Sequence, residues 1–268
     1  MSVAFSVLMS VYAREQPAFL EAALQSLAGQ LEPAEQVVLV KDGPLTPELE
    51  AVIESFSGRL PLHICALPTN QGLATALNEG LKFCRHDWVA RMDSDDVALP
   101  ERFAMQAAFL AKHHDIDVLG SCIEERDVSM VRVLSRREVP CAHADIKRFA
   151  KRRSPMSHPV VVFRKAAVFA VGGYPLFQRA QDYALWSLLL VRGYRFANQP
   201  ECLLWMRTGE GLMARRGYQY FLNELRLLRF QREIGLLNRF DYALNVLARF
   251  ALRIAPNRLK QLIYSLAR

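Results

Sequence analysis

"VARMDSDDVALPERF", residues 89–103, places three carboxylates within four positions, directly after an apolar run. The carboxylates are Asp93, Asp95 and Asp96, and the preceding residues "WVARM" have the composition of a buried strand. Like charges this close together repel one another, so the fold must neutralise them. A divalent cation would do so, and the oxygen ligands suit Mg²⁺ or Mn²⁺.

Alternation along a strand would point Asp93 and Asp95 the same way and turn Asp96 aside. Magnesium sites often use only one or two protein carboxylates together with substrate phosphates. An alternative stays open at this point: Asp95 or Asp96 could instead cap the helix expected near Pro100.

The first hundred residues alternate between short apolar runs and segments with helical spacing. Helices are expected at 17–30, 46–58 and 72–84, where Pro17 and a Thr-Pro pair mark two of the helix starts. This rhythm predicts an α/β fold with a doubly wound, mostly parallel sheet flanked by helices. The expected strands, buried on both faces, lie at 5–12, 36–42, 62–67 and 88–93.

Polar residues follow each of these strands. Ligands of such sheets bind beyond the carboxyl ends of the strands, so these residues predict a binding site on one rim. Along the chain the strand ends carry Ser10, Val11 and Tyr12, then Asp42 and Gly43, then Asn70, Gln71 and Gly72, then Asp93 to Asp96.

The rhythm changes after Pro100. A helix is expected at 101–113, strands at 116–125 and 159–165, and an amphipathic helix at 181–193. From about Tyr218 onward nearly everything has helical character. The expected organisation is a domain over 1–215, made of two halves at 1–100 and 101–215, followed by a helical extension over 216–268.

Composition excludes several classes of protein. Of the 268 residues 51% are apolar, which excludes global disorder. Five scattered cysteines without a C-x-x-C pair argue against a zinc site or a disulfide framework. No apolar run reaches the ~20 residues that span a bilayer, and the N-terminus lacks the basic region of a signal peptide. These features predict a cytoplasmic location.

Positive charge is concentrated at the C-terminal end. Residues 215–268 hold 11 Lys and Arg against 3 Asp and Glu, whereas residues 1–214 hold 23 against 24. A nucleic-acid-binding protein would spread its basic residues over a reading surface, so no nucleic-acid partner is expected. The basic, leucine-rich extension could lie on an anionic membrane, or it could dock on the catalytic domain or a homodimer partner. Both alternatives stay open here.

Several short motifs occur in an order and spacing that resemble a known family. They are "VLMSVY" with Glu15, "VLVKDGPL", "NQGLATALNEGL", "ARMDSDDVALPERF", "RRSPMSHPVVVFRK", "VGGY" and "AQDYALW". Over roughly residues 4–215 the chain resembles family 2 glycosyltransferases of the GT-A fold. Its likeness is to the bacterial enzymes that build exopolysaccharide, capsule and lipopolysaccharide.

The resemblance implies a nucleotide-sugar donor, most often a UDP-sugar, and a Mn²⁺ or Mg²⁺ cofactor. It assigns nucleotide-sugar binding to the half at 1–100 and acceptor binding to the half at 101–215. It places Asp42 against the uracil ring, Asp93 toward the ribose or sugar, and Asp95 on the metal. The implied nucleotide-sugar site comprises Ser10, Val11, Tyr12, Glu15, Asp42, Asn70, Gly72, Asp93 and Ser94.

The resemblance also implies an inverting transfer in which a carboxylate deprotonates the acceptor hydroxyl. Asp182 matches the family's base, although Gln181 stands where Glu is common. His158, Gln181 and Arg207 are implied as acceptor or diphosphate contacts. A purely structural role stays open for each of three residues. Asp182 could be an acidic residue that favours the N-terminus of a helix, His158 a packed core residue, and Arg207 part of a surface ion pair.

The acceptors implied by the resemblance are glycans or lipid-linked oligosaccharides, which fits a peripheral position on the inner face of the plasma membrane. Two rival functions remain at this point. A sugar nucleotidyltransferase would need a glycine-rich loop after the first strand, where this chain has "VYAREQP". A catalytically inactive sugar-binding module would not need the intact carboxylates.

Overall fold

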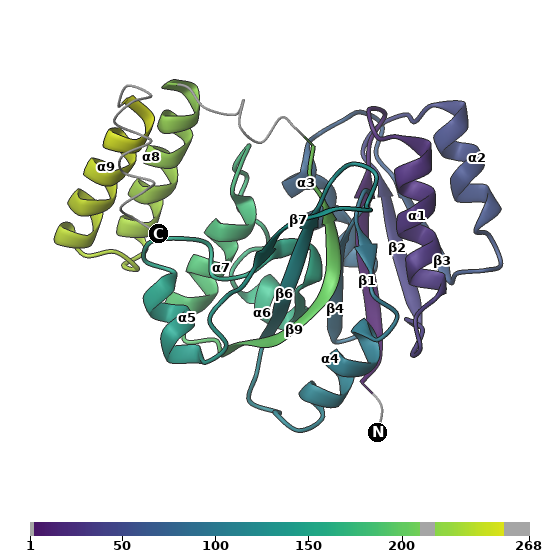
Figure 1. Ribbon diagram of the computed structural model, residues 1–268, viewed down its shortest axis with the longest axis horizontal. Helices are drawn as coiled ribbons and strands as arrows, with labels where there is room; N and C mark the ends of the chain where they lie inside the picture. Colours follow the sequence, from purple (N-terminus) through teal and green to yellow (C-terminus); the bar gives the residue numbers. More distant parts are fainter. Residues whose placement is uncertain (1–2, 210–217, 255–268) are drawn as a thin grey trace. The chain divides into compact units, whose positions relative to one another are not determined.

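The computed structural model describes residues 3–209 and 218–254 (Figure 1). The chain divides into two compact units, residues 1–208 and 209–268. The boundary expected at 215/216 lies outside the described residues, as do Arg215 and Arg216 themselves.

The first half of unit one has the expected α/β alternation. β1 lies between β2 and β4, β2 pairs with β3, and all these pairs are parallel (Figure 1). The four expected strands and three expected helices all form, with slightly shorter bounds. They are β1 (Phe5–Val11), α1 (Pro17–Ala28), β2 (Gln36–Lys41), α2 (Pro47–Ser55), β3 (Leu62–Ala66), α3 (Leu73–Phe83) and β4 (Trp88–Asp93).

The second half continues the same sheet with mixed direction. The strand order is β3-β2-β1-β4-β8-β6-β9-β5, with β7 paired to β6. Only β6 and β9 are parallel here, so the sheet is parallel in one half and mixed in the other. The elements are β5 (Val97–Ala98), α4 (Arg102–Leu110), β6 (Val118–Arg126), β7 (Val133–Arg137), α5 (His143–Phe149), a 3₁₀ turn (His158–Val160), β8 (Val162–Arg164), α6 (Lys165–Ala170), α7 (Gln181–Val191) and β9 (Phe196–Arg207).

Two apolar layers hold helices on the two faces of the sheet. Alternate residues of β1 serve both layers: Val7 and Met9 face one, and Leu8 faces the other. The first layer packs against α1, α2 and α4, and the second against α3, α5, α6 and α7. Strand β3 departs from the expected burial on both faces, because it is an edge strand and its residues are partly or fully exposed.

The described part of unit two consists of α8 (Tyr218–Glu233) and α9 (Arg239–Ile254), which confirms a helical extension. The two helices contact each other through an aromatic pair, Phe221 and Phe250, whose ring centroids lie 5.9 Å apart. An ion pair between Arg249 Nη1 and Glu224 Oε1, 2.7 Å, adds to this contact. Among the described residues, no helix has the length and apolar character that crossing a membrane requires.

Gly43 offers a direct test of the sheet rim. Its φ is +88°, and a Cβ there would lie 2.7 Å from the backbone nitrogen of Asn70. We expect Gly43→Ala to lower the free energy of unfolding by roughly 2 kcal/mol or more, because left-handed strain and a clash add together. Gly58→Ala is the matched control: φ is +80°, but nothing lies within 4 Å of the added Cβ. Urea unfolding measures both variants. An equal loss of unfolding free energy in Gly43→Ala and Gly58→Ala would contradict the close approach of the 70–72 loop to Gly43.

Candidate active site

Four carboxylates gather at the carboxyl ends of β1 and β4. These strands pair so that Ser10 lies opposite Asp93. The Ser94 hydroxyl donates to Glu15 Oε2, which brings the segment after β1 against the segment after β4. A turn at 94–95 ends the strand geometry, so simple alternation does not govern where Asp95 and Asp96 point.

Arg207, at the end of β9, fixes the acidic segment from the other side. Its backbone N–H donates to Asp96 Oδ1 at 2.9 Å, and its Nε donates to the Asp95 carbonyl at 2.9 Å. The Arg207 guanidinium lies over the Phe19 ring, 3.9 Å from its centroid. Helix α4 begins after Glu101 without a side-chain cap, so the capping alternative for Asp95 and Asp96 is wrong.

The electrostatics of this cluster favour a bound cation. Burial, followed by the charges of Asp93 and Glu15, raises the pKa of Asp95 to about 6. Burial and the neighbouring carboxylates also raise the pKa of Asp96 well above its usual range. Asp96 Oδ2 is buried and has no hydrogen-bond partner in the described chain. Hard oxygen donors that repel one another fit Mg²⁺ or Mn²⁺.

The protein supplies few ligands for such an ion. Among residues 3–209 and 218–254, no three His, Cys, Asp or Glu side chains are arranged to hold a metal. A site with one or two protein carboxylates, completed by diphosphate and water, is the arrangement that Mg²⁺ accepts. Asp95 remains the predicted ligand, because it is partly exposed, whereas Asp96 is buried and accepts a hydrogen bond from the Arg207 backbone N–H.

Two buried arginines, missed by the sequence reasoning, lie beneath the cluster. Arg91 has no exposed surface and forms an ion pair with Asp93 Oδ1. Arg102 is equally buried and donates from Nη2 to the Arg91 carbonyl at 2.6 Å. Burial, with the nearby charge of Arg91, lowers the pKa of Arg102 to about 9. An arginine inside the apolar run "WVARM" was the signal available in the sequence.

Asp42 organises the loop between β3 and α3. Its carboxylate accepts hydrogen bonds from the backbone N–H groups of Gln71 (2.7 Å) and Gly72 (3.0 Å). Asn70 Nδ2 donates to the Asp42 carbonyl at 3.3 Å. Asp42 is buried while Asn70 is exposed. The structure thus gives Asp42 a positioning role, and a contact with uracil stays a prediction.

The three residues at the end of β1 differ in how far their side chains are exposed at the rim. Ser10 is half-buried and Tyr12 is 44% exposed, so both side chains are accessible. Val11 lies wholly in the core, and its carbonyl accepts a hydrogen bond from the Asp42 N–H at 2.8 Å. Its side chain is therefore not available to a nucleotide.

Asp182 stands in the first turn of α7, as expected, and is partly exposed, whereas Gln181 is buried. Burial raises the pKa of Asp182, while the backbone N–H of Tyr183 and the charge of Arg137 oppose that rise. Asp93 adds to the rise, so the two carboxylates influence each other electrostatically. The charges of Asp93, at the end of β4, and of Arg137, at the end of β7, therefore both act on the Asp182 carboxyl.

His158 occupies a different environment from the one implied for an acceptor contact. It is buried, its Nε2 lies 3.1 Å from the Tyr174 hydroxyl, and its ring packs against Trp186. Burial and the charge of Arg91 lower the pKa of His158 well below its usual range, so the ring is neutral. These contacts favour the packed alternative.

Comparison with known proteins places this geometry in context. The profile of the family described as "Glycosyl transferase family 2" matches residues 6–179. The amylovoran biosynthesis glycosyltransferase AmsE of Erwinia amylovora is 38% identical over 97% of both chains. The UDP-Gal:alpha-D-GlcNAc-diphosphoundecaprenol beta-1,3-galactosyltransferase of Escherichia coli is 34% identical, over 97% of this chain and 94% of that protein.

Solved structures share the fold. S. aureus TarS 1–349, in complex with UDP-GlcNAc, superposes with a TM-score of 0.69 at 22% sequence identity. The match covers 93% of this chain and 73% of that one. At this level of identity the likeness concerns the fold alone.

Asp95→Asn tests the charge state of the rim. Without added metal at pH 7.5, we expect the free energy of unfolding of the variant to exceed that of the wild type by roughly 1–2 kcal/mol, because the substitution removes a buried charge that neighbouring carboxylates repel. The gain should shrink as the pH falls below about 6, the raised pKa of Asp95 in the folded state, and vanish only below about pH 3, where the wild-type carboxyl is protonated in both the folded and the unfolded state. Urea unfolding across this range measures it.

The exposed carboxylate Asp87 provides the control, since Asp87→Asn removes a charge outside the cluster. Adding MnCl₂ should stabilise the wild type and leave Asp95→Asn unchanged. Equal stabilisation of both proteins by the metal would show that Asp95 is not a ligand.

Proposed function

The chain belongs to glycosyl transferase family 2, and on that premise we propose that it moves a sugar from UDP to a hydroxyl group of a lipid-linked acceptor with inversion at the anomeric carbon. The observation that carries this proposal is the acidic segment Asp93–Asp96 at the carboxyl end of β4, held between Glu15 and Arg207, together with Asp182 in the first turn of α7. These carboxylates come from opposite halves of the sequence.

The named relatives support the donor and the setting. The E. coli relative is named for UDP-Gal as donor and a diphosphoundecaprenol-linked GlcNAc as acceptor, and AmsE is named for polysaccharide biosynthesis. We extend a UDP-sugar donor and a lipid-linked or glycan acceptor to this chain. Family membership argues against the nucleotidyltransferase alternative, and the intact carboxylates argue against an inactive module.

Asp95 would hold Mn²⁺ or Mg²⁺, which supplies positive charge to the leaving diphosphate. The rest of the donor site is built by the protein itself. Arg207 lies beside Asp95 and Asp96 with its guanidinium fixed on Phe19, in a position to add a second positive charge. The Asp42 carboxylate holds the 70–72 loop at the nucleotide end of the rim.

Asp182 is suited to act as the general base. A carboxylate in a partly buried site has a raised pKa, which strengthens its pull on a proton. In the proposed reaction Asp182 accepts the proton of the acceptor hydroxyl as that oxygen bonds to the anomeric carbon. The bond from this carbon to the UDP oxygen breaks at the same time, and UDP leaves with the bonding pair. A single displacement of this kind inverts the anomeric centre.

The second unit presents an apolar face suited to a membrane. In α9 the exposed side chains recur every three to four residues: Phe240 (75% exposed), Ala243, Leu244 (48%), Leu247 (65%) and Ala251. Asp241, Asn245 and Arg249 are half-buried on the other side of α9. We propose that this face lies in the interface of an anionic membrane, where the net charge of +8 over residues 215–268 adds attraction.

Asp182→Asn separates catalysis from donor binding. The variant keeps the shape of the side chain and loses the proton acceptor, so sugar transfer should slow by roughly 10²–10⁴-fold. UDP-sugar affinity should stay near the wild-type value. The wild-type rate should rise with pH as Asp182 loses its proton. UDP release with a panel of UDP-sugars and a lipid-linked acceptor measures the rates, and normal turnover in the variant would exclude Asp182 as the base.

Vesicle co-sedimentation tests the membrane proposal. The wild type should bind anionic vesicles, and binding should weaken as salt screens the charges but persist because apolar side chains insert. The double variant Leu244→Ser/Leu247→Ser should lose the salt-resistant part. Leu176→Ser, a leucine 76% exposed in unit one, is the matched control. Unchanged sedimentation of the double variant would direct attention to docking on another protein surface.

A further inference from the structure

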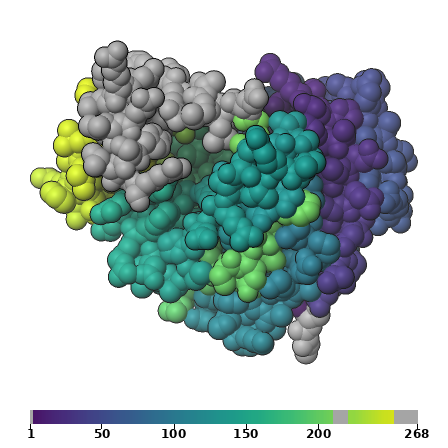
Figure 2. Space-filling model, viewed as in Figure 1, coloured from purple at the N-terminus to yellow at the C-terminus, as the bar shows by residue number. Residues whose placement is uncertain are grey.

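The β6–β7 hairpin presents an unusual surface to solvent. Its strands pair from Ile123 with Arg137 to Arg126 with Val133, and residues 127–132 form the connecting loop. In Figure 1 the hairpin crosses in front of the sheet, and Figure 2 shows its teal atoms on the viewed face. Four of its large apolar side chains are exposed: Val128 (45%), Val131 (81%), Val133 (46%) and Leu134 (44%).

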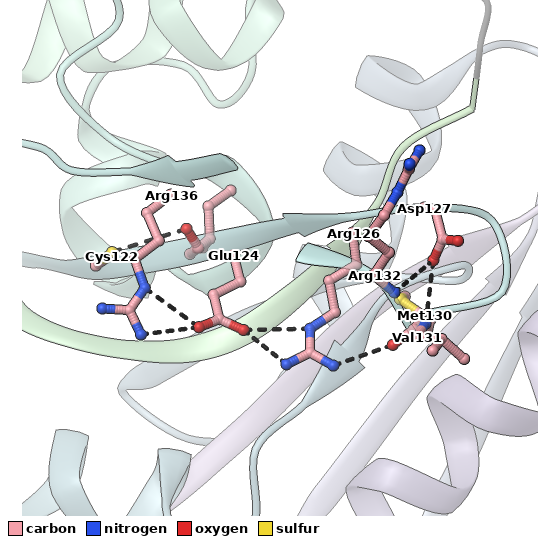
Figure 3. Close-up of polar contacts among 9 residues, drawn as sticks. Cys122, Glu124, Arg126, Asp127, Met130, Val131, Arg132 and Arg136 are labelled. Atoms are coloured by element: carbon pink, nitrogen blue, oxygen red, sulfur yellow. Dashed lines mark hydrogen bonds and ion pairs between the residues drawn. The ribbon is translucent and has the colours of Figure 1, made fainter. Parts of the chain in front are cut away.

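A polar network holds this hairpin in shape, as Figure 3 shows. Asp127 Oδ1 accepts from the backbone N–H groups of Val131 and Arg132, each at 3.0 Å. Arg126 Nη1 donates to the Met130 carbonyl at 3.0 Å, and Met130 has a left-handed φ of 63°. These hydrogen bonds fix the loop backbone, while the side chains of Val128 and Val131 are exposed beside those of Ser129 and Arg132. A fixed apolar surface of this kind fits a partner with apolar chemistry.

Arg207 connects the hairpin to the acidic segment. At its tip, the Arg207 guanidinium donates to the Val128 carbonyl while its Nε donates to the Asp95 carbonyl. At the far end of β7, the charge of Arg137 acts on Asp182. Residues 131–137 in extended form cover roughly 20 Å. The tip of the hairpin thus shares Arg207 with the acidic segment, and the far end of β7 carries Arg137, whose guanidinium donates to the carbonyls of Ser154 and Met156.

Residues 123–137 hold four arginines against three carboxylates, a net charge of +1, and three of the arginines lie in the segment 132–137, which has no carboxylate. Arg126 and Arg136 share one carboxylate, Glu124, with nitrogen to oxygen distances of 2.8 and 3.0 Å. Hydrogen bonds from Arg126, and also from Arg136, lower the pKa of Glu124, so it stays ionised. In the described parts of the chain, the Arg132 guanidinium has no hydrogen bond or ion pair. Strand β7 itself, "VLSRR", has no acidic residue.

We propose that the β6–β7 hairpin is the docking surface for the lipid diphosphate of the acceptor. The lipid chain lies along Val131 in the loop and Leu134 on β7, and the phosphates contact the arginines at 132 and 136, which alternate with Leu134 on the same side of the strand. This inference rests on the proposed function and names the part of the protein that receives the lipid. It places the sugar, which is attached to the phosphates, toward Arg137 and Asp182.

A second copy of the chain fits this surface less well. A symmetric contact along β7 would set its arginines against the same arginines of the partner, and like charges opposite one another are destabilising. An anionic amphiphile satisfies the apolar and the positive parts of the surface together.

The test measures binding rather than catalysis. Decyl diphosphate, below its micelle concentration, is titrated calorimetrically into the full-length protein saturated with UDP and MnCl₂, so that the donor site is filled. Wild type should bind it saturably without displacing UDP. Val131→Ser/Leu134→Ser should weaken this binding about ten-fold, because two apolar contacts are lost. Arg132→Gln should weaken binding and reduce its dependence on salt.

Leu31→Ser is the matched control, since Leu31 is 68% exposed at a site far along the chain from the hairpin and should leave binding unchanged. UDP affinity in every variant reports that the donor site is intact. Absence of saturable binding, competition with UDP, equal affinity in all variants, or an equal loss in Leu31→Ser overturns the proposal. A wild-type dimer in sedimentation velocity that Val131→Ser/Leu134→Ser dissociates would assign the surface to a second copy instead.

The binding experiment and the sugar-transfer assay can fail independently, so the docking proposal and the proposed reaction are tested separately. Hairpin-dependent binding of decyl diphosphate in a protein that transfers no sugar would retain the docking surface and refute the reaction. Sugar transfer that depends on Asp182, without hairpin-dependent binding of decyl diphosphate, would support the reaction and refute the docking surface.

Discussion

Repulsion among the carboxylates at the end of β4 is the constraint on which the site depends. Burial and mutual charge raise the pKa of both Asp95 and Asp96, so the ionised cluster destabilises the protein. The fold offsets this with Arg91 and Arg102, two fully buried guanidinium groups set directly beneath the rim. Burying such charges is unfavourable unless they are paired, so cluster and arginines require each other. A rim held in this state suits the cation and diphosphate of the proposed reaction.

The change in sheet direction separates the two substrate sites of the proposed reaction. The parallel half ends its strands on a common rim with Asp42, Glu15 and Asp93, where the donor is proposed to bind. In the mixed half β6 and β7 form an antiparallel hairpin, which needs no crossover helix and leaves β7 attached to β6 alone among the described strands. That freedom lets a hairpin cross the rim. Strand β9 then closes the site, because its last residue, Arg207, contacts both the hairpin and the acidic segment.

The family resemblance indicated which residues belong to the site, and the structure showed which of their side chains are accessible to a ligand. The motif around His158 was implied as an acceptor contact, yet the ring is buried against Tyr174 and Trp186. Val11 follows the same pattern, since its side chain fills the core beside α1. A sequence motif contains residues that support the site as well as residues that could touch a substrate. Only burial and contacts separate the two groups.

The sequence by itself determined the elements of the first half, because apolar periodicity and helix-start residues act locally: Pro17 and Thr46 stand where α1 and α2 begin. It also indicated the rim, since strand ends in a parallel sheet must meet at one edge, and its motifs pointed to Asp182. The tertiary structure alone decided that the sheet becomes mixed and that Asp96 turns toward the Arg207 backbone. It also decided that Arg91, Arg102 and the β6–β7 hairpin complete the site. These features depend on contacts between residues far apart in the chain, such as Arg207 with Asp95 and Val128, and local patterns carry no information about which distant residues will meet.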